Sequence, residues 1–274
     1  MPIRSSSVGS AATARHSGRL ALKSVMTEFP TIVLIRQGHK QMTRGALHFD
    51  LQAGHAVVVA AGQAFDLVST PADGAFVSSF LVPSSHLIEE IAAAYAEVPI
   101  LRDAHPIADV EREFLDAFDR AIAAVSDPRR LPPKIVENRE REVLIWLAHK
   151  GVKFSHSGPA DVAQRVRSLL LQDLTRNWQA RDAAASVGMS EATLRRHLQK
   201  LGVSFQQVLT DVRMSRALAL LQVTDDAIGR IALDVGYESP SRFAARFKRR
   251  FAVSPSEVRS GALTSSIGER KRHA

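Results

Sequence analysis

The sequence lacks cysteine, and it also lacks any apolar run approaching the roughly 20 residues of a bilayer-spanning helix. Without cysteine there is no disulfide framework, no thiolate nucleophile and no zinc or iron–sulfur site with cysteine ligands. Without a long apolar run, we expect a soluble protein. A P-loop and a glycine-rich dinucleotide turn are missing as well, so the common nucleotide-binding motifs do not account for this chain.

Charge is distributed unevenly between the two long parts of the chain. Residues 161–261 carry 16 basic and 10 acidic residues, a net charge of +6, whereas residues 26–160 carry 13 basic and 17 acidic residues, a net charge of −4. The length of 274 residues is enough for two domains, each with its own core. A basic domain indicates a polyanionic partner, most often nucleic acid.

The first 25 residues contain no acidic residue and are rich in serine, alanine and arginine. This composition offers little material for a core, so we expect residues 1–25 to be a disordered tail. Two alternatives are an organellar presequence and a translation start at Met26. Residues 263–274 form a second basic segment that we also expect to be disordered.

Short apolar segments follow one another from Thr31 to about Leu87, separated by glycine, proline or aspartate. Their length and their β-branched residues are typical of strands in an antiparallel barrel or sandwich. We expect turns at Ala53–Gly54 and at Gly62. The predicted strands lie within residues 31–38, 46–54, 56–62, 64–70 and 76–82.

Apolar residues beyond Ser84 recur at steps of three and four, which predicts amphipathic helices at 107–125 and 134–149. We interpret these helices as packing against the barrel; the alternative is that one of their faces pairs with a second copy of the chain. Glycine, serine and proline at 151–163 then predict a linker between the two domains.

The basic region repeats one helical arrangement. Residues 181–202 and 226–251 each contain a short apolar helix, a glycine, one apolar residue and a serine that opens a second helix. The glycines, Gly188 and Gly236, stand where a tight turn between helices needs positive φ, which glycine adopts at low cost. The sequence therefore predicts two helix-turn-helix motifs.

The second helix of each motif has a well-defined start and two different faces. Ser190 and Ser239 are suited to cap these helices, and Pro240 suits the first helical position. Arg246 and Arg250 flank the apolar stripe, so we expect them to extend their stems or to pair locally. The expected buried stripes are Leu194, Leu198 and Leu201 in the first motif and Phe243, Phe247 and Phe251 in the second.

Opposite each stripe, arginine lies beside small residues, together with glutamine in the first motif and lysine in the second. A helix with such a face can enter the major groove, where arginine contacts guanine or phosphate. For one helix alone, a charged face is ordinarily a solvated surface. Two capped copies in a basic domain favour DNA binding instead.

Residues 164–261 resemble the DNA-binding domain of the AraC/XylS family of bacterial transcription regulators. The likeness is carried by "GMSEATLRRHLQKLGVSF", by "DVRMSRALALLQ" and by "GYESPSRFAARFKRRFAVSPSEVR". The chain departs from the family pattern at Ala252, commonly glycine, and at Val258, commonly aromatic, which are packing positions. Residues 32–62 resemble, more faintly, the cupin-like sensor domain of the same family.

The resemblance implies an α+β protein, with an N-terminal cupin-like β-barrel and following helices, then an all-α domain with two helix-turn-helix motifs. The implied domains are a sensor and dimerisation domain at 26–150 and a DNA-binding domain at 164–262. The residues implied to contact bases or phosphates are Ser190, Glu191, Ala192, Arg195, Arg196, Gln199, Ser239, Pro240, Ser241, Arg242, Ala244, Ala245, Lys248 and Arg249.

The same resemblance implies a cytoplasmic regulator, an activator more than a repressor, that binds double-stranded DNA. RNA polymerase, a small-molecule effector and a second copy of the chain are the further partners implied; no membrane, cofactor or metal is. One alternative is an architectural DNA-binding protein without an effector. Another is a barrel enzyme joined to a DNA anchor.

Enzyme interpretations find little support in the residues. Metal-binding cupins use a His-x-His pair with a nearby glutamate, whereas His39, His48 and His55 are scattered, so we interpret them as surface or core residues. The DNA-repair methyl acceptors that share this helix-turn-helix need a cysteine to take the methyl group, and the chain has none.

Overall fold

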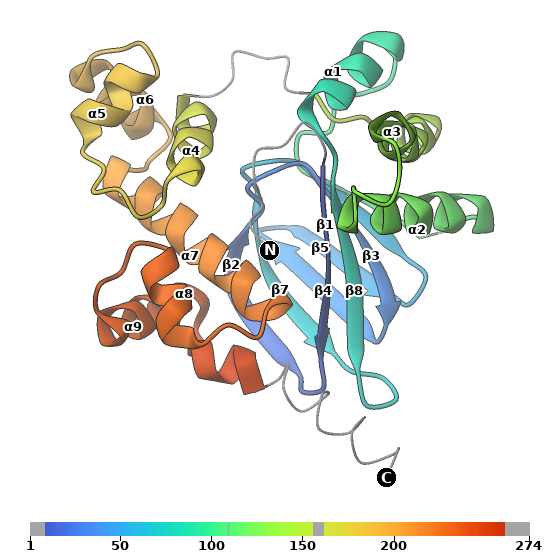
Figure 1. Cartoon of the computed structure of the whole chain (residues 1–274), viewed down its shortest axis with the longest axis horizontal. Helices are drawn as coiled ribbons and strands as arrows, with labels where there is room; N and C mark the ends of the chain where they lie inside the picture. The colour runs from blue at the N-terminus through green and yellow to red at the C-terminus, as the bar shows by residue number, and fades with distance from the viewer. Residues whose placement is uncertain (1–8, 109, 156–161, 261–274) are drawn as a thin grey trace.

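The computed structural model describes residues 9–108, 110–155 and 162–260. Two antiparallel sheets face each other in the N-terminal part, and helices make up the C-terminal part (Figure 1). The expected α+β architecture is therefore confirmed. One sheet has the order β1-β8-β3-β6-β9 and the other β2-β7-β4-β5. The strands are β1 (Ser10–His16), β2 (Leu20–Met26), β3 (Thr31–Gln37), β4 (His39–Arg44), β5 (Leu47–Gln52), β6 (Ala56–Val59), β7 (Ala64–Thr70), β8 (Phe76–Val82) and β9 (Ala104–Ile107).

The five-stranded sheet is buried on both faces. On β3, Val33 and Ile35 point between the sheets, whereas Ile32 and Leu34 point to a second core beneath helices. This is why Thr31–Ile35 are all buried and why the segment reads as a continuous apolar run. The four-stranded sheet has one buried face, since its outward positions carry polar residues such as Gln41 and Asp66.

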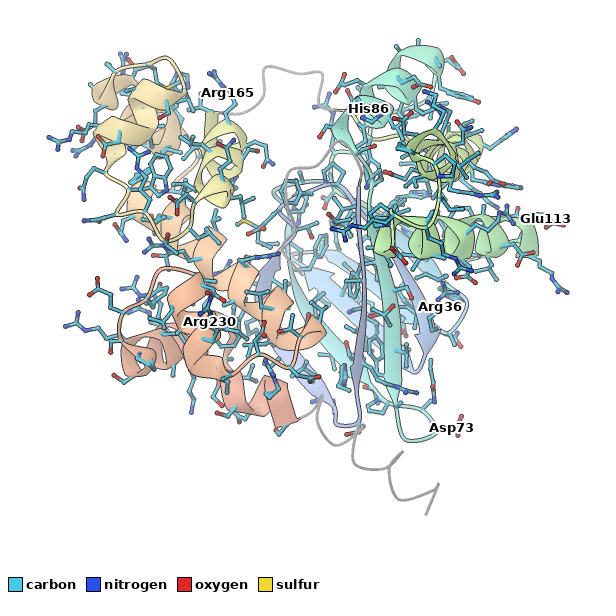
Figure 2. The ribbon with its side chains drawn as sticks, in the orientation of Figure 1. Arg36, Asp73, His86, Glu113, Arg165 and Arg230 are labelled. Carbon is cyan, nitrogen blue, oxygen red and sulfur yellow. The ribbon has the colours of Figure 1, made fainter. Side chains whose placement is uncertain are left out.

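Three helices cover the outer face of the five-stranded sheet: α1 (Ser85–Ala94), α2 (Arg112–Ser126) and α3 (Pro133–His149). Phe114 and Phe118 of α2 are fully buried in this layer. Arg36 of β3, which is labelled in Figure 2, pairs with Asp119 of α2. The prediction of two amphipathic helices packed against the strands is confirmed, with α2 beginning five residues later than predicted.

The prediction of a disordered tail at 1–25 is wrong for residues 10–25, and residues 1–8 lie outside the described part of the chain. Strand β1 pairs with β8 along its whole length, and β2 pairs with β7. Both are edge strands, so hydrogen bonds to strands 40 to 70 residues away order them. Amino-acid composition carries no information about such long-range pairing. Because the residues of β1 are small and contribute little apolar area, nothing in the sequence indicated a strand there.

The predicted linker at 151–163 is also wrong at its two ends. Val152 and Phe154 are buried in the core beneath the helices, and Lys153 Nζ donates hydrogen bonds of 2.9, 2.6 and 3.2 Å to carbonyls of Ala92, Tyr95 and Ala96. At the other end, 162–163 already belong to a helix. Residues 156–161 lie outside the described part of the chain.

Strands β4 and β9 and helix α1 were not predicted. The reason is clearest for β4, whose inward positions hold Lys40, Met42 and Arg44 and whose outward positions hold polar residues. Two of the three inward side chains are charged, so the apolar alternation that marks a half-buried strand is absent.

No helix in the described ranges is long and apolar enough to cross a membrane.

Helices make up the described residues 162–260, where residues 255–260 are also helical, and the helix α7 connects two small cores. The first core surrounds Leu194 and Val212, and the second surrounds Phe247 and Leu221. Leu20 and Leu22 of β2 join the second core, so the helical part packs against the edge of the sandwich. The helices are α4 (Val162–Gln172), α5 (Ala180–Ser186), α6 (Glu191–Lys200), α7 (Phe205–Val223), α8 (Ile228–Asp234) and α9 (Pro240–Phe251).

Candidate nucleic-acid interface

The turns and caps of both motifs have the predicted geometry. Gly188 and Gly236 have φ of +76° and +81°. Ser190 Oγ accepts a hydrogen bond of 3.2 Å from the amide of Thr193, three residues into α6. Ser239 Oγ accepts one of 3.4 Å from the amide of Arg242, and Pro240 is the first residue of α9. Local chemistry alone therefore sets where α6 and α9 begin.

The apolar stripes are buried with one exception. Phe243, Phe247 and Phe251 are fully buried and contact one another in sequence, with centroid distances of 5.7 and 4.7 Å. In the first motif Leu194 and Leu198 are buried as predicted, but Leu201 is 49% exposed. Leu201 is the residue after the last helical one, and the chain turns there toward Gly202, so the helical wheel no longer applies.

Arg246 and Arg250 of α9 both bind the linking helix α7. Arg250 Nε donates a hydrogen bond of 2.7 Å to Asp211 Oδ1, and Arg246 Nη1 donates one of 3.2 Å to Thr210 Oγ1. We expected these arginines to pair with residues nearby in the sequence. That prediction was wrong, since both partners lie more than 35 residues away along the chain. These two arginines orient α9 on α7 and are not on the outward face.

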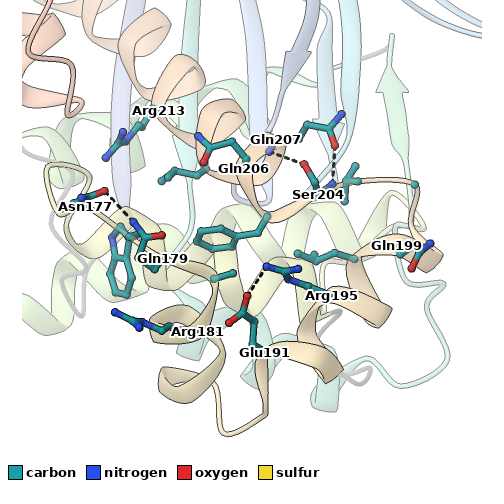
Figure 3. Close-up of a pocket in the computed structure, with 17 residues that line it drawn as sticks. Asn177, Gln179, Arg181, Glu191, Arg195, Gln199, Ser204, Gln206, Gln207 and Arg213 are labelled. Carbon is teal, nitrogen blue, oxygen red and sulfur yellow. Dashed lines mark hydrogen bonds and ion pairs between the residues drawn. The ribbon is translucent and has the colours of Figure 1, made fainter.

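The outward face of α6 carries the predicted DNA-contacting residues. Ala192, Arg196 and Gln199 are exposed, and the side chain of Arg195 is 71% exposed. Arg195 Nη2 lies 2.6 Å from Glu191 Oε1, one turn earlier on the same helix (Figure 3). Two of the predicted residues are thus paired with each other in the free protein, so DNA would have to compete with this exposed pair.

The outward face of α9 is more uniformly positive. Pro240, Ser241, Arg242, Ala245, Lys248 and Arg249 are exposed, whereas Ala244 is partly buried against the motif. Arginine or lysine occupies three of the six exposed positions, and the three side chains between them are small. A face of this kind can approach the duplex closely and contact phosphate.

Helix α7 sets how far apart the two motifs are. It has 19 residues and therefore spans roughly 28 Å. Figure 1 shows α6 and α9 in the helical part of the molecule, connected through α7. One turn of DNA is about 34 Å, so the length of α7 is comparable with the distance between successive major grooves on one side of a duplex.

A groove of about 1000 Å³ lies beside α6, between the start of α5 and the start of α7 (Figure 3). Trp178 forms part of its wall, with the guanidinium of Arg176 4.1 Å from the indole ring. Arg213 of α7 contributes another part and donates hydrogen bonds of 3.0 Å to the carbonyls of Leu174 and Arg176.

The groove shares Glu191, Arg195 and Gln199 with the outward face of α6, so it is continuous with that face. Sequence reasoning missed the contribution of Trp178 and Arg213. The sequence shows Trp178 in "TRNW" and Arg213 in "DVRM", but the two residues are far apart along the chain. Nothing in their spacing indicates that both line one groove.

The histidines considered as metal ligands do not converge. His39 pairs with Asp50 on the outward face of the four-stranded sheet, and His48 lies opposite Thr43, four residues further along β4. His55 stands at the turn before β6, where its amide and carbonyl hydrogen bond to other backbone groups. Within the described ranges, no three histidine, cysteine, aspartate or glutamate residues form a group that could hold a metal ion.

Two family profiles match the chain and together cover most of it. The profile described as the AraC-type transcriptional regulator N-terminus matches residues 13–151, and the profile of a helix-turn-helix domain matches residues 183–261. The first match includes most of β1 and all of β2, in agreement with the strands that the structure places there.

Similar curated proteins match through the C-terminal region. The transcriptional regulator SirC of Salmonella typhimurium is 37% identical over 92 residues, which are 34% of this chain and 31% of SirC. The urease operon transcriptional activator of Escherichia coli is 35% identical over 107 residues, which are 39% of this chain and 36% of that protein. Each match thus spans only about a third of the relative's length.

A solved structure matches nearly the whole chain. The crystal structure of ToxT from Vibrio cholerae, bound to an unsaturated fatty acid, has a TM-score of 0.70 with 16% sequence identity. The superposition covers 94% of this chain and 96% of ToxT. At this identity the likeness establishes the fold, including a two-sheet part followed by the two motifs.

Proposed function

The chain belongs to the AraC family of transcriptional regulators, and on that premise we propose that it is a sequence-specific DNA-binding regulator. The observation that carries the proposal is the pair of capped helices, α6 and α9, whose polar and positively charged faces are exposed. The apolar face of each helix is buried in its own core, which leaves the opposite face available for DNA.

We assign base contacts to residues along the outward side of each helix, all exposed except the partly buried Glu191 and Ala244, and phosphate contacts to the capping serines and to the end of α9. Arg195 and Arg242 are the central base-contacting residues, because arginine can donate two parallel hydrogen bonds to guanine. The other proposed base contacts are Glu191, Ala192, Arg196, Gln199, Pro240, Ser241, Ala244 and Ala245. The proposed phosphate contacts are Ser190, Ser239, Lys248 and Arg249.

The N-terminal part is proposed to be the effector-responsive half. We divide the chain into a sensor domain at 10–155 and a DNA-binding domain at 162–260, because the first ends with Phe154 in its core and the second begins with α4. The fatty acid in ToxT supports a small-molecule effector by analogy. Activation, contact with RNA polymerase and pairing with a second copy are proposed on family grounds.

The test is selection of bound sequences from random DNA, followed by gel-shift measurement of the selected site against random DNA. Arg195→Ala and Arg242→Ala should each narrow the affinity ratio by roughly 5- to 150-fold, the equivalent of about 1–3 kcal/mol per bidentate base contact. Unchanged discrimination in both variants would remove these residues from base contact.

Arg230→Ala is the matched control. Its side chain is 71% exposed, like that of Arg195, and it pairs with Asp234 one turn away, as Arg195 pairs with Glu191 (labelled in Figure 2). It lies on α8, outside the two recognition helices, so its loss should leave discrimination intact. Equal affinity of the unaltered protein for all DNA sequences would favour an architectural binder instead.

A further inference from the structure

Helix α7 passes from one core to the other at its middle. Its buried residues up to Val212 belong to the first core, whereas those from Met214 onward belong to the second. Arg213 stands at the changeover, as the ninth of the 19 residues of the helix. Long helices are rarely straight, so any second connection between the cores bears on how α6 and α9 lie relative to each other.

The segment between α4 and α5 provides a second connection. Leu174 packs against both cores. Asp173 Oδ1 accepts hydrogen bonds of 3.1, 2.7 and 3.1 Å from the amide and hydroxyl of Thr175 and from the amide of Arg176. The indole of Trp178, which is buried in the first core, donates a hydrogen bond of 2.8 Å to the carbonyl of Asp173. The segment is therefore a closed turn that is attached to the first core.

Arg213 attaches this turn to α7 (labelled in Figure 3). Its Nε donates a hydrogen bond of 3.0 Å to the carbonyl of Leu174, and its Nη2 donates one of 3.0 Å to the carbonyl of Arg176. Because the donors of a guanidinium lie in one rigid plane, two bonds from one side chain set an orientation as well as a distance. The charge on the donor makes these bonds stronger than those between neutral groups.

The turn of the second motif lies against the same arginine. A Cβ on Gly236 would stand 2.8 Å from Arg213 Nη2 and 2.3 Å from the carbonyl oxygen of Leu174. The ring of the next residue, Tyr237, is 5.8 Å from the guanidinium and 5.7 Å from the ring of Phe243 on α9. One side chain thus joins the middle of α7, the turn attached to the first core and the turn that precedes α9.

We propose that Arg213 is a positioning residue that holds the two recognition helices at one separation, so that the protein reads the spacing between the two halves of its DNA site. Two rigidly linked modules bind together only where both halves are within reach, whereas loosely linked modules tolerate altered spacing. One added base pair moves a half-site by about 3.4 Å along the duplex and by roughly 35° around it. The inference rests on the proposed function, but it assigns Arg213 no contact with DNA.

The experiment starts from the site selected out of random DNA. Gel shifts compare the selected spacing with sites that have one base pair added or removed between the halves, and with a site that keeps only one half. The unsubstituted full chain should bind the selected spacing about tenfold or more tightly than either altered spacing. Arg213→Met removes both donors and keeps an apolar stem. It should reduce this spacing ratio to about two- to threefold and leave affinity for the single half within about twofold of the parent.

Two further variants serve as controls. Arg213→Lys keeps the charge but not the planar fork, so its spacing ratio should lie between those of the parent and Arg213→Met. Arg165→Met is the matched control, because Arg165 Nη2 also donates a hydrogen bond to a backbone carbonyl, that of Val187, with both partners in elements of the first core. Its spacing ratio should equal that of the parent.

Melting temperatures show whether each variant is folded. If Arg213→Met is not folded, Arg213→Lys decides, and its spacing ratio must fall at least about threefold below that of the parent. The proposal is overturned if folded Arg213→Met keeps the parent ratio, if the parent binds all spacings equally, or if affinity for the single half falls as much as affinity for the whole site. Discrimination between the selected site and random DNA by the unsubstituted chain tests the proposed function separately. If that discrimination holds while the spacing ratio does not depend on Arg213, only the role of Arg213 is lost.

Discussion

At the scale of single residues, arginines with the same charge have different surroundings. Arg249 and Arg250 are adjacent on α9, yet Arg249 is exposed while the side chain of Arg250 is 16% exposed and pairs with Asp211 on α7. The guanidinium of Arg250 also lies 5.6 Å from the ring of Phe251. One side chain is available to DNA, and the other holds α9 on the linking helix.

Substitution of each arginine by alanine should separate these two roles. Arg250→Ala should destabilise the protein by about 1–3 kcal/mol, because it leaves Asp211 with a partly buried charge and no partner. Arg249→Ala should leave stability unchanged, weaken binding to all DNA sequences alike and lower the slope of log affinity against log salt by about 1. Thermal melts and salt-dependent gel shifts measure the two effects; interchanged results would reverse the assignment.

At the scale of elements, the two helix-turn-helix turns share a backbone conformation but differ in their surroundings. A Cβ built on Gly188 meets nothing within 4 Å. A Cβ built on Gly236 would lie 2.3 Å from the carbonyl oxygen of Leu174 and 2.8 Å from Arg213 Nη2. The second turn is thus packed against the segment between α4 and α5 and against α7.

Gly188→Ala and Gly236→Ala form a matched pair. Gly188→Ala should cost about 1 kcal/mol, the conformational penalty of positive φ for a residue with a Cβ. Gly236→Ala adds a collision with backbone and should cost several kcal/mol, enough to loosen the second motif. Chemical denaturation of both variants checks the difference, and equal losses of stability would show that the packing around Gly236 yields readily.

At the scale of the whole molecule, two contacts join the sandwich to the helical domain, one apolar and one polar. Leu20 and Leu22 enter the core formed by α7, α8 and α9. Near the β2–β3 connection, Gln164 Nε2 of α4 donates a hydrogen bond of 3.0 Å to the carbonyl of Glu28. The Glu28 carboxyl is buried there, where it interacts electrostatically with Arg216 and Arg167, and among the described residues its Oε1 has no hydrogen-bond partner.

This contact predicts a pH dependence of stability. Burial raises the pKa of Glu28 to about 8, against the opposing effect of Arg216 and Arg167. Between the ordinary pKa of glutamate and about 8, the folded protein keeps a proton that the unfolded chain has released, so this group lowers stability as pH rises through that window. Each pKa unit corresponds to about 1.4 kcal/mol.

Glu28→Gln removes the titrating group and keeps its shape. The variant should melt close to the parent at pH 5 and several degrees above it at pH 8, since 1 kcal/mol shifts the melting temperature by about 2–4 °C in a chain of this size. Glu97→Gln, on an exposed loop, is the control and should follow the parent at both values. Parallel pH profiles for Glu28→Gln and the parent would contradict the prediction.

What the sequence determined by itself is local. Positive φ at two glycines, two serine caps, the proline at the start of α9 and the buried phenylalanines all follow from interactions within one or two turns, and the structure confirms each of them. The α+β order and the exposed faces of α6 and α9 could be predicted for the same reason, because amphipathic spacing is written along the chain.

Only the tertiary structure decided the long-range contacts. It paired residues 10–26 with β7 and β8, put Val152 and Phe154 into a core, attached Arg250 to α7 and left Lys40 between the sheets. Each of these depends on a partner between about 30 and 70 residues away, and composition and periodicity carry no record of such distances. The neighbours that surround a side chain after folding therefore decide whether it is exposed, packed in a core or paired between elements.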